Sequence, residues 1–168
     1  MLVVVCGLPG SGKSEAAKLI AQKINASHLQ TDVVRKKLDF SIKAKKETYK
    51  TLLREADKIL KNNRSVVLDG TFYRQYLRDW VKNLAKNQKI KIFFIEVICD
   101  EKIIQKRINK RYNKFKKGYT ESPADFRVYL KMKKVWRKIK EKRIIIDNSK
   151  DLKWLKKQIR RAVENLNP

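Results

Sequence analysis

A short segment near the start of the chain combines the groups that hold a string of phosphates. It consists of Gly7, Leu8, Pro9, Gly10, Ser11, Gly12, Lys13 and Ser14, between an apolar run and an amphipathic run. Glycines let backbone N–H groups turn toward phosphate oxygens, and a helix N-terminus adds partial positive charge there. Lys13 should reach the β- and γ-phosphates and Ser14 should ligate Mg²⁺, so we expect ATP or another nucleoside triphosphate to bind here. A chance glycine turn is the alternative.

A carboxylate and an arginine follow at a spacing that suits phosphoryl transfer. Asp32 comes directly after a weak short strand expected near residues 27–31. A carboxylate at that point can accept the proton of an acceptor hydroxyl and align its oxygen for in-line attack. Arg35 would lie beside Asp32 if a helix begins there, and its fork can hold an anionic group on the acceptor. A helix cap with a surface arginine is the alternative.

A second carboxylate, Asp69, follows three apolar residues. It could hold Mg²⁺ through water or fix Arg35 by a salt bridge, and the sequence leaves both open; a plain Asp-Gly turn is the alternative. Thr71, Arg74 and Arg78 follow on the expected loop and helix. They are candidate contacts for the phosphate acceptor, although helix-surface arginines are as often solvated.

Two further arginines, Arg107 and Arg111, are four residues apart and therefore share one face of an expected helix. They lie at the edge of residues 112–121, which have no apolar period and are expected to form a loop. The same loop carries Lys114, Lys116 and Lys117. A solvated basic helix is the alternative interpretation.

Short apolar runs alternate with longer amphipathic segments over the whole chain. Strands are expected at 2–6, 27–31, 65–68, 90–98 and 143–146, and helices at 13–24, 47–60, 74–85, 101–111, 122–139 and 152–166. The helix at 122 is expected to start with Ser122 as cap and Pro123 at the first helical position. The alternation predicts one α/β domain with a parallel sheet that helices cover on both faces.

The charge balance predicts a polyanionic partner. The 168 residues hold 43 Lys and Arg against 17 Asp and Glu, which gives a formal net charge of +26. Such an excess attracts nucleic acid, acidic membranes or phosphorylated metabolites, with compositional bias as the alternative. No apolar run reaches the roughly 18 residues of a membrane helix, and two cysteines make no disulfide framework. We therefore expect a cytoplasmic protein with no membrane contact, as a monomer or weak dimer.

Together these motifs resemble the P-loop kinases that phosphorylate small or terminal hydroxyls. The group of polynucleotide kinase, gluconate kinase and seryl-tRNA kinase is the most similar. The resemblance rests on four features and spans residues 1 to about 147. They are the phosphate-binding segment 7–14, which we call the cradle; the motif Asp32-Val33-Val34-Arg35; residues 66–71; and the pair Arg107 and Arg111. It implies a P-loop NTPase fold with a five-stranded parallel sheet in the order 2-3-1-4-5. It also implies a single domain, 1–168, with a small lid near 107–122.

The resemblance also implies roles for individual residues. In this family the matching aspartate, here Asp32, acts as base, and the matching arginine, Arg35, binds the acceptor phosphate. One of Arg107 and Arg111 would cover the adenine and the other would meet the transferring phosphate, while Asn148 would flank the adenine. The leading interpretation is an ATP- and Mg²⁺-dependent kinase acting on a hydroxyl of a nucleic acid, RNA or tRNA foremost. A kinase of a sugar, nucleoside or other metabolite is the second, and a non-catalytic nucleotide-binding module docking on RNA is the third.

Overall fold

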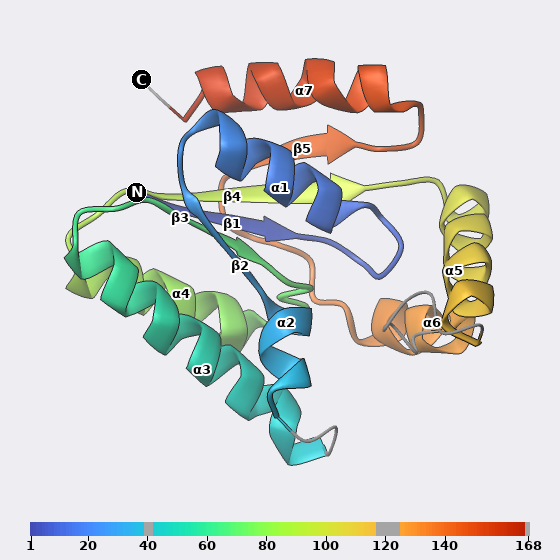
Figure 1. The fold of residues 1–168 in the computed structure, drawn as a ribbon, viewed down its shortest axis with the longest axis horizontal. Helices are drawn as coiled ribbons and strands as arrows, with labels where there is room; N and C mark the ends of the chain where they lie inside the picture. The colour runs from blue at the N-terminus through green and yellow to red at the C-terminus, as the bar shows by residue number, and fades with distance from the viewer. Residues whose placement is uncertain (39–41, 117–124, 167–168) are drawn as a thin grey trace.

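Five parallel strands form one sheet in the order β2-β3-β1-β4-β5 (Figure 1). The computed structural model describes residues 1–38, 42–116 and 125–166. The strands are β1 (Leu2–Cys6), β2 (Ser27–Gln30), β3 (Val66–Asp69), β4 (Ile92–Ile98) and β5 (Arg143–Asp147). The helices are α1 (Lys13–Lys23), α2 (Thr31–Lys36), α3 (Ile42–Lys61), α4 (Gln75–Asn87), α5 (Glu101–Lys116), α6 (Phe126–Val135) and α7 (Leu152–Glu164). The predicted sheet order is confirmed.

The central strand β1 is buried along its whole length because helices cover both faces of the sheet. Val4 lies beside Leu68 of β3 and Phe94 of β4, and these side chains pack under α3 and α4. The alternate residues of β1 pack under α1 and α7 on the other face. A strand enclosed on both faces reads as a continuous apolar run, which is how β1 could be predicted.

The sheet order changes direction at β1, which pairs with β3 on one side and with β4 on the other. The loops that leave the carboxyl ends of β1 and its neighbours therefore run to opposite sides, and ligands of open parallel sheets bind in the crevice between them. Figure 1 shows α2, α5 and α6 grouped around this edge. The fold thus positions the segment 7–14 at the expected binding edge.

Two boundaries around the predicted lid differ from the sequence-based expectation. Residues 112–116 were expected in a loop but continue α5 to Lys116, so that expectation is wrong. Lys114 and Lys116 are good helix formers, and a helix that has already begun extends at little cost, so the missing apolar period does not end it. Residues 117–122 of the predicted lid lie outside the described residues.

The next helix, α6, is shorter than expected at both ends. It begins at Phe126, and the Asp125 carboxylate caps it by accepting the N–H groups of Arg127 and Val128. The predicted cap Ser122 and the following Pro123 lie outside the described residues. The helix ends at Val135 because the backbone turns extended and the Arg137 N–H donates to the carbonyl oxygen of Tyr73.

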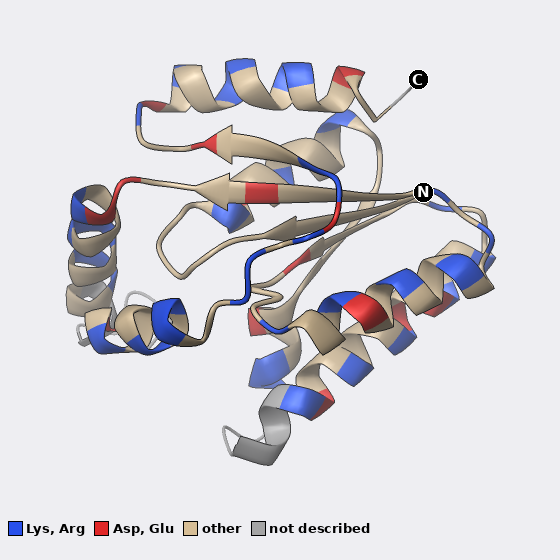
Figure 2. Ribbon diagram, turned by 180° about the vertical axis from the view of Figure 1, so that it is seen from behind, with Lys and Arg blue, Asp and Glu red and all other residues tan. Residues whose placement is uncertain are grey.

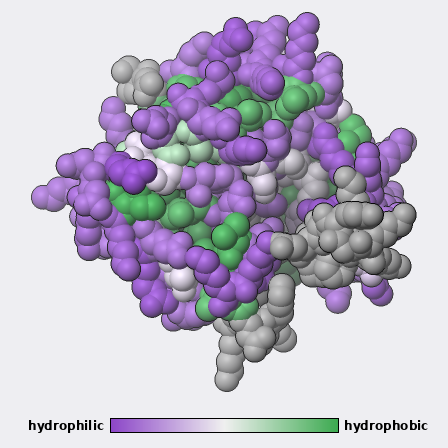
Figure 3. Space-filling view, in the orientation of Figure 1, coloured by the Kyte–Doolittle hydropathy of each residue, from purple (hydrophilic) through white to green (hydrophobic). Residues whose placement is uncertain are grey.

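The surface of the molecule is strongly charged. Figure 2 shows Lys and Arg on every helix, with acidic residues interspersed among them. The face seen in Figure 3 is mainly hydrophilic, with smaller apolar areas between polar side chains. No helix in the described part of the chain is long and apolar enough to cross a membrane.

Candidate functional site

The loop between β1 and α1 is so tightly enclosed that glycine is required at two positions. Gly10 and Gly12 adopt left-handed φ angles of +83° and +86°. A Cβ on Gly12 would lie 1.9 Å from Asn148 Nδ2, and one on Gly10 would lie 2.9 Å from side-chain atoms of Ile104 and Ile108. The loop therefore presents backbone rather than side chains, which is the surface that phosphate oxygens need.

Asn148, which follows β5, holds this loop from the opposite end of the chain. Its Nδ2 donates to the carbonyl oxygen of Ser11 at 2.9 Å, and its backbone N–H donates to Ile98. Arg107 of α5 lies on the same side, because its Nη1 is 3.6 Å from the position of a Cβ on Gly12. Arg107 Nη1 also donates to the Cys99 Sγ at 3.4 Å. The two residues predicted to flank the nucleotide are thus brought to the cradle.

The residues predicted to bind phosphate and metal lie at the start of α1 and at the end of the neighbouring strand β3. Lys13 is the first residue of α1 and is half-buried, and Ser14 beside it is exposed. Asp69 ends β3 next to Val5 of β1, so its carboxylate lies at the strand end from which the cradle begins. The next residue, Gly70, donates its N–H to the Val5 carbonyl oxygen.

The environment of Asp69 fits a metal-ligating carboxylate. The residue is 3% exposed, and among the described residues its Oδ1 has no hydrogen-bond partner. A buried carboxylate oxygen without a partner is costly unless a cation or an ordered water completes it. Mg²⁺ prefers oxygen ligands and keeps several waters, so Ser14 and Asp69 are a suitable donor set.

His28 is a neighbour of Asp69 that sequence reasoning missed. Its Nε2 lies 3.6 Å from Asp69 Oδ2, and Gln30 of the same strand contacts the ring. The salt bridge between Asp69 and Arg35 that the sequence left open is not formed in the described part of the chain. The signal was present in β2, where residues 28 and 30 share one face and Gln30 pairs with Asp69.

Asp32 and Arg35 form an ion pair at the other side of the cradle. Arg35 Nη1 donates to Asp32 Oδ1 at 3.0 Å, and the side chain of Asp32 is 63% exposed. Asp32 lies in the first turn of α2, directly after β2. Burial lowers the pKa of the Arg111 guanidinium, while the negative charge of Asp32 opposes that shift. The structure therefore brings Asp32, Arg35 and Arg111 from two helices to one region.

The segment 70–74 is fixed by Tyr49 of α3. It carries Thr71 and Arg74, which are predicted to contact the phosphate acceptor, and we call it the acceptor loop for that prediction. The Tyr49 hydroxyl hydrogen-bonds to Thr71 Oγ1 at 3.0 Å and accepts the Phe72 N–H at 3.2 Å. Phe72 is fully buried with a left-handed φ of +46°, and its ring meets that of Tyr49 edge to face at 5.1 Å. Burial raises the pKa of Tyr49 to about 12. Arg74 stands over the Tyr73 ring at 5.4 Å.

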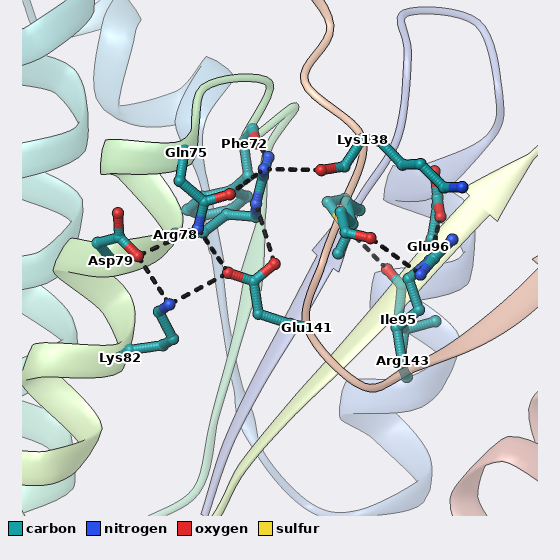
Figure 4. A network of polar contacts seen from close by, with 12 residues as sticks. Phe72, Gln75, Arg78, Asp79, Lys82, Ile95, Glu96, Lys138, Glu141 and Arg143 are labelled. Carbon is teal, nitrogen blue, oxygen red and sulfur yellow. Dashed lines mark hydrogen bonds and ion pairs between the residues drawn. The ribbon is translucent and has the colours of Figure 1, made fainter.

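Arg78 is buried instead of exposed on its helix (Figure 4). Its guanidinium donates to the carbonyl oxygens of Phe72 at 2.7 Å and Lys138 at 3.3 Å, and its Nε lies 3.3 Å from Glu141 Oε2. It also donates to the side chain of Gln75 at 2.7 Å. This placement excludes the alternative of a solvated helix-surface arginine. The predicted contact of Arg78 with the acceptor stays a prediction, and the contacts of its guanidinium favour a positioning role instead.

Solved structures with the same fold include two kinases and two complexes with nucleotides. APS kinase CysC of Mycobacterium tuberculosis, in complex with AMPPNP and APS, shares 19% identity at a TM-score of 0.72, over 99% of this chain and 97% of that one. A gluconokinase from Sinorhizobium meliloti 1021 shares 15% identity at a TM-score of 0.69, over 98% and 91%. Chaetomium thermophilum Kti12 in complex with ADP-AlF3 shares 14% identity at a TM-score of 0.76, over 99% and 97%. At such identities the likeness shows the fold alone, which is the P-loop NTPase fold.

The sequence itself matches the family AAA_33, described as an AAA domain, over residues 2–139. This range includes the cradle, Asp32, Asp69 and both arginines of α5, and it leaves out Asn148. The resemblance to P-loop kinases is thereby confirmed. Because the match covers most of the chain, the protein belongs to the AAA_33 family.

Proposed function

We propose that this protein is an ATP-dependent kinase that transfers the γ-phosphate to a hydroxyl of a nucleic acid, with RNA as the acceptor to test first. One observation carries the proposal. The exposed Asp32 carboxylate pairs with Arg35 and interacts electrostatically with Arg111. These groups lie at the edge of the sheet that carries the cradle, whose Lys13 begins α1. A base, cations for anionic groups and a phosphate loop at one edge are the parts that phosphoryl transfer needs.

The proposed reaction uses these groups in a defined way. The backbone of the cradle and Lys13 hold the β- and γ-phosphates, and Arg35 holds an anionic group of the acceptor. Asp32 accepts the hydroxyl proton while the oxygen attacks the γ-phosphorus and the bond to the ADP oxygen breaks. Arg111 stabilises the charge that spreads over the transferring phosphoryl group. Exposure of Asp32 lets the proton leave to solvent.

Ser14 and Asp69 would hold Mg²⁺, which supplies charge neutralisation on the β- and γ-phosphates when bound. Asn148 and Arg107 lie beside the loop and are proposed to flank the base of the nucleotide. The preference for ATP over another nucleoside triphosphate rests on this placement together with AMPPNP in the complex of the APS kinase.

The nature of the acceptor separates two candidate functions. The net charge of +26 favours a polyanion, because a small metabolite needs only two or three cationic contacts. A metabolite acceptor is the second candidate, and it is favoured by the structural likeness to an APS kinase and a gluconokinase. A nucleotide-binding module without catalysis is the third.

The decisive experiment offers labelled ATP and Mg²⁺ with a panel of RNA, DNA, tRNA and metabolites, and measures label on each. We expect transfer to nucleic acid in the wild type and none in a folded Lys13→Ala variant. Transfer to a metabolite alone would establish the second candidate. Transfer to no acceptor, with intact nucleotide binding, would contradict the kinase proposal and leave the third candidate.

A further inference from the structure

A groove between α3 and α4 lies outside the catalytic groups described above. Its volume is about 690 Å³. It is lined by Glu47, Lys50, Leu53, Arg54, Asp57, Lys58, Lys61 and Trp80. Leu53 and Trp80 supply the apolar part, and charged side chains of α3 supply most of the rest. The groove therefore joins an aromatic surface to a row of charges.

The groove leads away from the acceptor side of the site. α3 precedes β3 and α4 follows it, so both helices begin at the carboxyl edge of the sheet and run side by side away from it (Figure 1). Near its beginning α3 carries Tyr49, which bonds Thr71 of the acceptor loop, and Arg74 caps the start of α4. A polymer whose end lies at Asp32 would thus find the groove on its way out.

Trp80 lines the groove, is partly buried, and has an exposed aromatic neighbour on the same helix. Tyr76 lies outside the lining and is 42% exposed, and the two rings meet edge to face with their centroids 5.2 Å apart. The Lys46 ammonium stands over the Trp80 ring at 5.8 Å from its centroid. Aromatic rings next to cations are the surface on which single-stranded nucleic acids bind, because every base has a face that can stack.

The charges of the groove favour a polyanion. Four cations, Lys50, Arg54, Lys58 and Lys61, line it against two carboxylates, so the lining carries two more positive than negative charges. The carboxylates are paired within α3: Glu47 with Arg54 at 2.7 Å and with Lys50 at 3.5 Å, and Asp57 with Lys61 at 2.7 Å. A second copy of this chain is a poor occupant, because each copy carries a net charge of +26.

We propose that the groove between α3 and α4 binds a single-stranded segment of the RNA acceptor. Bases stack on Trp80 and Tyr76, and phosphates contact the lysines and the arginine of α3. This inference rests on the proposed function, since it names where the acceptor leaves the site. A metabolite kinase would have no use for an aromatic and cationic track that extends beyond the acceptor loop.

The test compares two pairs of charge reversals. The groove pair is Arg54→Glu with Lys58→Glu, and the control pair is Lys153→Glu with Lys157→Glu on exposed positions of α7, which covers the opposite face of the sheet. Both pairs change the net charge equally. The affinity for a labelled single-stranded RNA is measured by fluorescence anisotropy at low and at physiological salt. The RNA has about twelve nucleotides, a length within the usual range of site sizes for single-stranded nucleic acid.

We expect the groove pair to weaken RNA binding by about 10-fold or more and to reduce the log–log salt slope by about 1.4, at about 0.7 for each lost phosphate contact. The control pair should change affinity by less than about 2-fold. Trp80→Leu, checked by thermal melting for a retained fold, should weaken binding by about 5-fold or more through lost stacking. Equal losses of RNA affinity in the two charge-reversed variants, or an unchanged RNA affinity in Trp80→Leu, would overturn the inference that RNA binds in the groove.

Phosphoryl transfer separates this inference from the proposed function. The groove pair should keep its affinity for ATP and its kcat and raise only the KM for RNA. RNA that binds through the groove without being phosphorylated would support the groove and contradict the kinase proposal. If RNA is phosphorylated and its KM is unchanged in the groove pair, the kinase proposal is supported and the groove inference is contradicted. Self-association that the groove pair abolishes would assign the groove to a second copy and overturn the inference.

Discussion

The Asp32 carboxylate is surrounded by cations that could hold the anionic substrate beside it. It is the first acidic side chain after β2, and Arg35 keeps one of its oxygens engaged at 3.0 Å. In the proposed reaction the exposed carboxylate also takes the proton of the acceptor hydroxyl. Arg111, on α5, balances the charge of Asp32 from the opposite side of the cradle. One carboxylate therefore links the helix that would bind the acceptor to the helix that would meet the transferred phosphate.

Asp32→Asn tests this assignment because it keeps the shape of the side chain and removes the base. We expect transfer to fall by about 10²- to 10⁴-fold while ATP binding persists. Single-turnover transfer and nucleotide affinity are measured on the same preparation. A collapse of ATP affinity with surviving transfer would place Asp32 in the nucleotide or metal site instead.

Tyr49 connects α3 to the acceptor loop, and its loss should be measurable as stability. Tyr49→Phe leaves the buried Phe72 N–H and the Thr71 hydroxyl without this partner, which should cost about 1–3 kcal/mol of unfolding free energy at neutral pH. Urea denaturation measures it. A difference below the error of the method would mean that water replaces the hydroxyl.

The same substitution has a predicted pH dependence. Burial raises the pKa of Tyr49 from its ordinary value of 10.0 to about 12, so the folded state holds the phenol proton more tightly than the unfolded chain does. Its contribution to stability is present below pH 10 and is lost as the pH rises toward 12. The stability difference between wild type and Tyr49→Phe should therefore shrink above pH 10.

The helix α4 is joined to the chain after α6 by Arg78 and Glu141 (Figure 4). Arg78→Met should destabilise the protein by about 3–5 kcal/mol, because the carbonyl oxygens of Phe72 and Lys138 lose their donor and the half-buried Glu141 loses its fully buried cation, keeping Gln75 and Lys82. Arg78→Met combined with Glu141→Gln should recover part of this loss, as chemical denaturation would show. If Arg78 contacts the acceptor instead, the single variant would raise the KM for the acceptor with its stability intact.

Several elements could be predicted from the sequence because one physical signal controlled each of them. The buried run of β1 and the glycine spacing after it fixed the cradle, and the motif resemblance gave the sheet order. The burial of Arg78 could not be predicted from its residue type, since arginines are usually exposed. Yet it lies on the stripe of Val81 and Ala85, which marks the core face of α4. The end of α6 depended on a bond from Arg137 to the distant Tyr73, which no local pattern carries.

The excess of positive charge acts over the molecule as a whole. If RNA binds through several phosphates, its affinity should fall steeply with salt, with a log–log slope near −0.7 for each contact. Five contacts would give a slope of roughly −3.5. Charge reversal of the predicted lid lysines Lys114, Lys116 and Lys117 should flatten that slope and raise the KM for RNA more than that for ATP. A slope near zero, with RNA that accepts no phosphate, would favour the metabolite kinase.

The hydrogen bond between Asn148 and Ser11 has a consequence for synthesis of the chain on the ribosome. It joins residues 137 positions apart in the sequence, and β5, which carries Asn148 into place, is the last strand to be made. A nascent chain therefore exposes the whole motif 7–14 long before the loop can be held in its binding conformation. In a series of ribosome-arrested chains of increasing length, we expect a fluorescent ATP analogue to bind only after β5 and Asn148 have emerged. Binding by chains that stop before β5 would show that the first strands suffice.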